Sequence, residues 1–323
     1  MKARWIALLL AACAGLASAG PVSRVPEADR RGEEQTYLTF PEWYLVFSPD
    51  EYADLLEAHG TPSAFPWFGH VRQFWSAYAR VWDATKQYPF NGEYHTMIGV
   101  IGTSTTVEYG IRGAYETLVG RLTELTSAPN ATPEDRLAAE QARSYVEFVR
   151  VRPWYEFDFV TPLKRLWTDT PLFGDDMLRK WERRYLLTSD WAVKAAYAAL
   201  LEQATHSTFE TPKVTTVSVV REGDRSEVVA LPRYQGFTDA AMDIARRGGT
   251  FEDIAGNRGP ILASVVVPVM QPVAPGTSVL IRQPILTRPG FERRVVQVPV
   301  PQLAQRLRAH AAAGDAVEHV FDY

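Results

Sequence analysis

Residues 195–220 read AAYAALLEQATHSTFETPKVTTVSVV, and within this stretch the chain changes character. The segment Trp191 to Leu201 is apolar nearly all round, so we expect it at the centre of a helical bundle, in a helix from Asp175 to about Thr205. After Phe209 the chain becomes rich in valine and proline, and Val214 to Val220 has the composition of a β-strand. The change predicts an α+β protein in which an all-helical bundle is followed by a smaller α+β domain.

The helical part extends from this point towards the N-terminus. Eight of the nine tryptophans lie between Trp43 and Trp191, in segments of helical period. Ser48-Pro49 and Thr132-Pro133 are each followed by acidic residues, a pattern typical of helix starts. We expect helices at Ser48 to Ala58, Trp67 to Gln87, Glu93 to Thr126 and Thr132 to Arg150. Residues 36–208 are therefore assigned to the helical domain.

The C-terminal part, residues 209–323, alternates strands and helices. Val214 to Val220 and Glu227 to Leu231 flank Gly223-Asp224, which predicts a hairpin. Helices are expected at Thr238 to Arg247 and Pro301 to Ala313, set between further strands. This order suggests an α+β sandwich, with a ferredoxin-like arrangement as one option.

The N-terminus has the pattern of a secretory signal peptide. Lys2 and Arg4 precede the apolar run Trp5 to Ala14, and Ala17-Ser18-Ala19 supplies the small residues that signal peptidase requires. The pattern predicts a signal peptide over residues 1–19 and export to the periplasm.

A second processing route also fits this segment. Leu10-Ala11-Ala12-Cys13 matches a lipobox, in which the Cys13 thiol is lipidated and the chain is cleaved before it, although the apolar run before Cys13 is short. That route would hold the protein on a membrane surface. Residues 20–35 are polar and charged, so we expect a flexible tether on either route.

Composition excludes several function classes. The formal net charge of −4 gives no reason to expect nucleic-acid binding, and no cysteine follows Cys13, which leaves no disulfide or thiol chemistry in the mature chain. The sequence has no HExxH or ExxH metal motif, no GxSxG elbow, no P-loop and no dinucleotide glycine fingerprint. We therefore expect no cofactor and no metal site.

The segment Glu93 to Thr126 carries the first candidate site residues. Its apolar seam places Glu108 among large apolar residues at spacings of three and four: Met97, Ile101, Ser104, Glu108, Ile111, Tyr115, Leu118, Leu122 and Leu125. The seam predicts that Glu108 points into the core. A ladder of pairs through Arg112 to Glu116 would make both carboxylates structural, whereas a perturbed carboxylate would serve as a proton-transfer group or ligand contact.

Three further features of the helices bear on the site. Asp190 and Lys194 lie one helical turn apart and either pair with each other or, through Lys194, reach Glu108 on a neighbouring helix. His95 stands beside Glu93 near the start of the long helix. The same helix carries a stripe of small residues that predicts close packing against another helix or, alternatively, a bound ligand: Gly99, Gly102, Thr106, Gly110, Gly113, Thr117 and Gly120.

Four segments resemble a group of uncharacterised exported bacterial proteins: Tyr37 to Tyr44 with its PEWY sequence, Gly99 to Glu116, Arg179 to Arg184, and the terminal Glu318 to Tyr323, EHVFDY. We know of no activity for that group, so the resemblance implies no catalytic residue.

The sequence favours an exported, non-catalytic protein that binds a partner or associates with the cell envelope, with an envelope protein as the kind of partner expected. The alternative is a carboxylate-dependent hydrolase with its site between helices of the N-terminal domain. Its catalytic candidates would be Glu108, Glu116, Lys194 and His95.

Overall fold

The structure is a computed structural model that describes residues 23–59, 61–127, 131–208 and 214–323. The predicted signal segment and Cys13 lie outside these residues. The helices are α2 (Gln35–Glu42), α3 (Tyr44–His59), α4 (Trp67–Thr85), α5 (Gly92–Tyr115), α6 (Arg121–Glu124), α7 (Pro133–Val149), α8 (Val160–Thr168), α9 (Met177–Thr208), α10 (Gln235–Arg246) and α11 (Leu303–Ala313). The strands are β1 (Thr215–Glu222), β2 (Arg225–Pro232), β3 (Thr250–Ile254), β4 (Pro260–Pro268), β5 (Ser278–Pro284), β6 (Phe291–Pro299) and β7 (Ala316–Val320).

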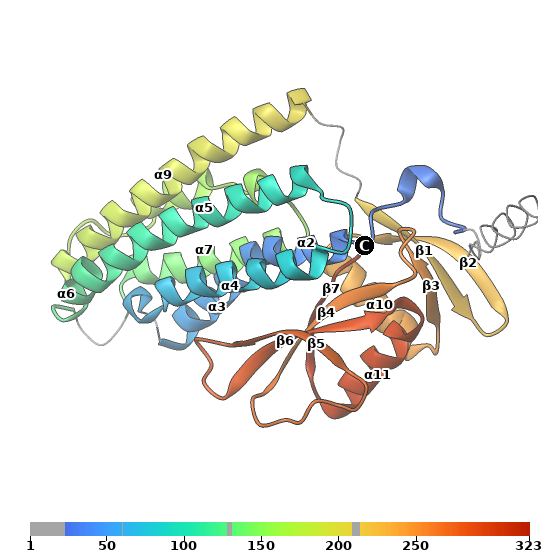
Figure 1. The fold of residues 1–323 in the computed structure, drawn as a ribbon. Coiled ribbons are helices and arrows are strands. Elements are labelled where there is room, and N and C mark those ends of the chain that lie inside the picture. The colour runs from blue at the N-terminus through green and yellow to red at the C-terminus, as the bar shows by residue number, and fades with distance from the viewer. Residues whose placement is uncertain (1–22, 60, 128–130, 209–213) are drawn as a thin grey trace, which may run out of the picture.

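The α+β class is confirmed: a layer of long helices precedes a region of strands with two helices (Figure 1). None of the described helices combines the length and the apolar composition needed to cross a bilayer.

One of the two predicted helix starts is confirmed. Thr132 caps α7, because its side chain accepts a hydrogen bond from the backbone N–H of Asp135 while the Asp135 carboxylate accepts one from the Thr132 N–H. The other start is wrong. Helix α3 begins at Tyr44, and Ser48 lies inside it with its hydroxyl 3.0 Å from Nδ1 of His70.

Glycine lets α4 approach α5 closely. A Cβ on Gly102 would lie 2.3 Å from the Phe74 ring, and one on Gly113 would lie 2.8 Å from the Trp67 Cβ. The prediction that the stripe packs against a helix is therefore confirmed at these two positions. Gly110, by contrast, faces open space.

Two antiparallel sheets form the C-terminal region. The first has the order β2-β1-β3, and its β1–β2 hairpin turns at Gly223, which has a φ of 60°. The second has the order β5-β6-β4-β7. The ferredoxin-like option is therefore wrong, since that arrangement needs one sheet, whereas β1 and β4 belong to different sheets.

The second sheet is covered on both faces, and its central strands are buried accordingly. In β4, Ile261 packs in the core beneath α10 and α11, whereas Leu262 packs in a core with Phe40 and Phe74 from α2 and α4. Alternate residues of one strand thus contact helices from both halves of the chain. The division into separate domains stays a prediction, and this shared core joins the two parts.

Residues 23–34 of the predicted tether lie against the first sheet. Val25 is 1% exposed, the Ser23 hydroxyl donates to Asp253 at 2.6 Å, and the Arg31 N–H donates to the carbonyl of Ala255 at 2.7 Å. This part of the segment is docked, because its polar groups find partners on β3 and the turn after it.

Helix α9 lies at the edge of the helical layer and not at its centre (Figure 1). Trp191 and Ala198 are buried, but Val193 is 67% exposed and Leu200 is 62% exposed. The expectation of a central helix is therefore wrong. A helix that is apolar on all sides is expected to lie in an apolar environment. The pattern does not indicate whether that environment comes from the same chain or from another molecule.

Candidate functional site

A network of charged side chains joins α5 to α9, which run antiparallel to each other. Lys194 Nζ lies 2.8 Å from Glu108 Oε1 and 3.2 Å from Asp190 Oδ1. Arg112 donates to the other oxygen of Asp190 at 3.0 Å and to Glu116 at 2.9 Å. Both partners considered for Lys194 are thus engaged at once, and the Arg112–Glu116 step of the predicted ladder is confirmed.

Glu116 is the most deeply buried member of this network. Its side chain is fully buried and accepts two hydrogen bonds from the Arg183 guanidinium, at 2.8 and 2.9 Å, besides the one from Arg112. It begins a π-helical turn, Glu116–Gly120, where a Cβ on residue 120 would lie 2.3 Å from the carboxylate. Burial alone would raise the pKa of Glu116, but Arg112 and Arg183 together lower it below its ordinary value. The carboxylate is therefore held ionised.

Neighbouring opposite charges also favour the charged forms of Asp190 and Lys194. Burial disfavours the charge of Asp190, but Lys194 and Arg112 lower its pKa. Burial also disfavours the ammonium of Lys194, but Asp190 and Glu108 raise its pKa above the ordinary value. A protonated lysine is no nucleophile, and an ionised carboxylate is no proton donor, so these shifts act against both roles.

The segment Arg179 to Arg184 turns its charged side chains inward from α9. Arg179 binds Asp135 at 3.0 Å, and Arg184 binds Glu134 at 2.6 Å, both on α7. These arginines are at most 2% exposed. Two of the segments that carry the sequence resemblance, Gly99 to Glu116 and Arg179 to Arg184, therefore meet through Glu116 and Arg183.

Glu108 does not point into the core, which corrects the prediction from the seam. Its side chain is 46% exposed, and its neighbours in the seam, Ile111 and Leu118, are 68% and 66% exposed. Helix α5 has two stripes, and the glycine-rich one packs inward at Gly102 and Gly113, because the rings of α4 fill the space that these glycines leave. The stripe of large apolar residues faces outward.

His95 lies apart from the charge network. Its ring stacks on Phe90 at 4.9 Å, meets Trp82 edge-on at 4.6 Å, and has Nδ1 3.0 Å from the Tyr78 hydroxyl. Burial lowers the pKa of His95. Its described contacts place it in an aromatic cluster with no carboxylate, so the four sequence candidates do not form one site.

A second charged cluster, between α3, α4 and the second sheet, was not anticipated. Arg293 on β6 donates to Glu318 at 2.7 Å and lies 3.3 Å from Glu51. Burial raises the pKa of Glu51, and Arg293 opposes the shift. His70 Nε2 lies 3.5 Å from Glu51 without hydrogen-bond geometry, and burial followed by the charge of Arg293 lowers the pKa of His70 to about 3.

The terminal EHVFDY segment lies against the PEWY segment. The His319 ring stacks on Trp43 at 3.6 Å, and Phe321 meets Phe40 edge-on at 5.7 Å. Thr238 accepts the Val320 N–H, and its hydroxyl lies 3.2 Å from Nδ1 of His319. Burial lowers the pKa of His319, so the ring is neutral. Both segments were singled out in the sequence, but their separation along the chain hid the contact.

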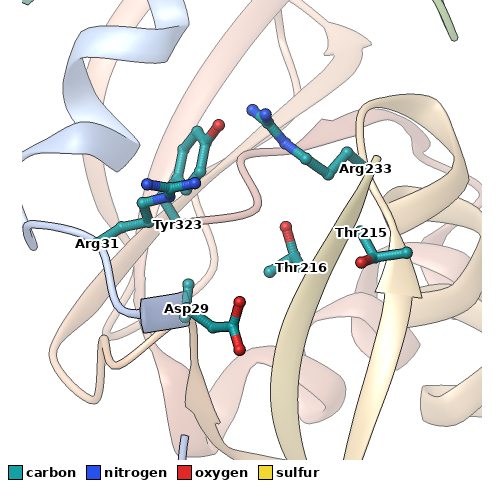
Figure 2. A pocket seen from close by; sticks show the side chains of 7 residues that line it. Asp29, Arg31, Thr215, Thr216, Arg233 and Tyr323 are labelled. Atoms are coloured by element: carbon teal, nitrogen blue, oxygen red, sulfur yellow. The ribbon is translucent and has the colours of Figure 1, made fainter. Parts of the chain in front are cut away.

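A small hollow lies beside Tyr323 of the EHVFDY segment (Figure 2). It is lined by Asp29, Arg31, Thr215, Thr216, Arg233, Ala255 and Tyr323. Asp322 accepts from Thr216 at 2.9 Å and lies 3.4 Å from Arg233, and burial raises the pKa of its carboxyl. The hollow has a volume of about 10 Å³, which is room for one water molecule and too little for an organic ligand.

Within the described ranges, no three His, Cys, Asp or Glu side chains gather in a way that could hold a metal ion. Comparison of the chain with known protein families, with curated proteins and with solved structures finds no match.

Proposed function

We propose that this chain is an exported, non-catalytic protein of the cell envelope that acts by binding a partner. One observation carries the proposal: the acidic and basic candidates between the helices form ion pairs with one another. Glu116 is shared by two arginines, and Lys194 by two carboxylates. Such an arrangement joins α5 to α9 through paired charges and supplies no group poised to transfer a proton.

Export rests on the N-terminal pattern of residues 1–19, and the resemblance to exported bacterial proteins agrees with it. Intact mass of the chain, isolated separately from the membrane and soluble fractions of the producing cells, tests this part. A chain that begins at Gly20 would be free in the periplasm, and one that begins at a lipid-modified Cys13 would be held on a membrane. A chain that keeps residues 1–19 and stays in the cytosol would contradict export.

The rival is a carboxylate-dependent hydrolase with its site between the helices. It is tested by assaying the purified chain against glycans, esters and peptides, beside a Lys194→Met variant. Lys194 is partly exposed, so this variant is expected to fold. The proposal predicts no turnover by either protein. Turnover by the wild type that the folded variant lacks would establish the hydrolase instead.

A further inference from the structure

Helix α9 is inside-out for a surface helix, because its charged side chains face the protein and its apolar side chains face water. Between Met177 and Leu200 its charged side chains are buried or partly buried, with partners on α5, α6, α7 and the loop before α9. The exposed positions of this span carry no charged residue; they are Met177, Leu178, Trp181, Tyr185, Ser189, Ala192, Val193, Ala196, Tyr197, Ala199 and Leu200. Water is an unfavourable environment for such a face.

Helices α5 and α6, with the π-helical turn Glu116–Gly120 between them and the C-cap residue Leu125 after α6, present a matching face beside it. Their outward positions follow spacings of three and four: Met97, Val100, Ser104, Val107, Ile111, Ala114, Leu118, Leu122 and Leu125. This is the spacing by which helices pack in coiled coils and four-helix bundles. We call the outward residues of α5, α6 and α9 in these two sets the outer face.

The outer face is large enough for a stable interface. The span from Met97 to Leu125 is about 42 Å at 1.5 Å per residue, and two neighbouring helices are about 20 Å across. The resulting area, on the order of 800 Å², is what each partner contributes to an interface of standard size. Figure 1 shows that α5 and α9 lie along the side of the helical layer that is remote from the strands, so neither sheet hinders access.

We propose that the outer face binds the outer face of a second copy of this chain, related by a two-fold axis that passes near Ala114. An antiparallel pair of helices with an apolar face is half of a four-helix bundle, and a second copy supplies the other half. The inference does not depend on the proposed function or on the location of the protein.

Two charged side chains beside the outer face fit self-association. From Met97 to Leu125 the described chain exposes two charged side chains, the acidic Glu108 and the basic Arg121. They lie at equal distances along the chain on either side of Ala114 and Tyr115. An antiparallel two-fold pairing therefore brings Glu108 of each copy level with Arg121 of the other. The single exposed base beside this face and a net charge of −4 disfavour an anionic lipid surface as the occupant.

The mass of the purified mature chain in solution, measured by light scattering, tests the proposal. The wild type is expected at twice the mass of the chain at micromolar concentrations. Ile111→Asp combined with Leu118→Asp is expected to give a monomer, whereas Met270→Asp, which alters a 92% exposed residue in the loop after β4, is expected to remain a dimer. Circular dichroism checks that each variant keeps its helices.

If the double variant does not fold, Arg121→Glu provides a second test. It sets like charges opposite each other and should raise the dimer dissociation constant several-fold. Arg121→Lys, which keeps the charge, should leave the constant unchanged. A monomeric wild type would overturn the proposal. So would a dimer that the Ile111 and Leu118 changes leave intact. A monomer that sediments with phosphatidylethanolamine–phosphatidylglycerol vesicles, and loses this with the double variant, would assign the outer face to lipid instead.

Discussion

Helices α9 and α10 lie in the same chain but bury opposite kinds of side chain. Helix α10 buries Phe237, Ala241 and Ile244 against the sheets and exposes Arg246 to water. Helix α9 buries Arg179 and its neighbouring arginines and exposes leucine, valine and tyrosine. The contrast shows that α10 presents charged side chains to water, whereas the exposed side of α9 between Met177 and Leu200 carries no charged side chain.

The two arrangements also differ in energetic character. Burial of Phe237 is favourable by itself, on the order of 2 kcal/mol for an apolar side chain. A buried arginine has a desolvation cost that only well-placed carboxylates offset, so the pair adds little net stability but is costly to break. Changes in the two regions should therefore have different signatures.

The largest effect is expected from removing one partner of the buried network. Arg183→Met leaves the Glu116 carboxylate fully buried with Arg112 as its remaining cation. The loss should be about 3–5 kcal/mol in the free energy of unfolding, measured by urea denaturation. The matched change Arg246→Met, at a 69% exposed side chain of α10, should cost less than about 1 kcal/mol. Equal losses of unfolding free energy in the two variants would contradict the proposed difference between α9 and α10.

The glycines of α5 give the next largest effect. Gly102→Ala should destabilise by about 1–3 kcal/mol, because the new methyl group meets the Phe74 ring and α4 must move. Gly110→Ala has open space around it and should stabilise by about 0.5–1 kcal/mol through helix propensity. Thermal unfolding of the two variants compares them directly. A loss of stability in Gly110→Ala would show that another part of the protein covers Gly110.

Buried histidine predicts a loss of stability in acid. The folded state keeps His70 neutral down to a pKa of about 3, whereas the unfolded chain takes up a proton below about 6.5. The unfolded state therefore binds more protons, and stability falls as the pH drops below 6.5, by up to about 2 kcal/mol at pH 5. The raised pKa of Glu51 acts in the opposite direction, because there the folded state binds the proton more tightly.

Urea denaturation of the wild type and His70→Gln at pH 7 and pH 5 isolates the histidine. The variant should lose less stability between the two pH values than the wild type does. An identical loss would mean that His70 is protonated in the folded protein.

The smallest effect is expected at Glu108. Glu108→Gln removes one of the two carboxylates around Lys194 at a half-exposed position, so the free energy of unfolding should change by no more than about 0.5 kcal/mol. A loss of several kcal/mol in the same urea assay would indicate that Glu108 is buried, as its place in the apolar seam first suggested.

Two local signals in the sequence predicted the structure correctly, whereas a third, the helix start at Ser48, was wrong because α3 already begins at Tyr44. The capping box at Thr132 and the hairpin turn at Gly223 depend on residues a few positions apart, and both are confirmed. So is the α+β class, which follows from the change in composition near residue 209.

Sequence reasoning failed where two faces compete. Helix α5 has an apolar stripe and a glycine stripe, and hydrophobicity alone selects the wrong one as the inner face. The rings of Phe74 and Trp67 on α4 decide the outcome, because glycine lets them pack against the backbone. The stacking of Trp43 on His319 and the sharing of Arg293 by Glu51 and Glu318 depend on long-range contacts, so no spacing in the sequence signals them.

The most direct test of the account is a disulfide across the proposed two-fold axis. In a chain without Cys13, Ala114→Cys places one thiol of each copy beside the axis, so mild oxidation should give a crosslinked dimer in high yield, while Ala312→Cys on the exposed side of α11 should not. Crosslinking at Ala312 but not at Ala114, or at neither, would contradict the claim that the inside-out face of the helical layer is where two copies meet.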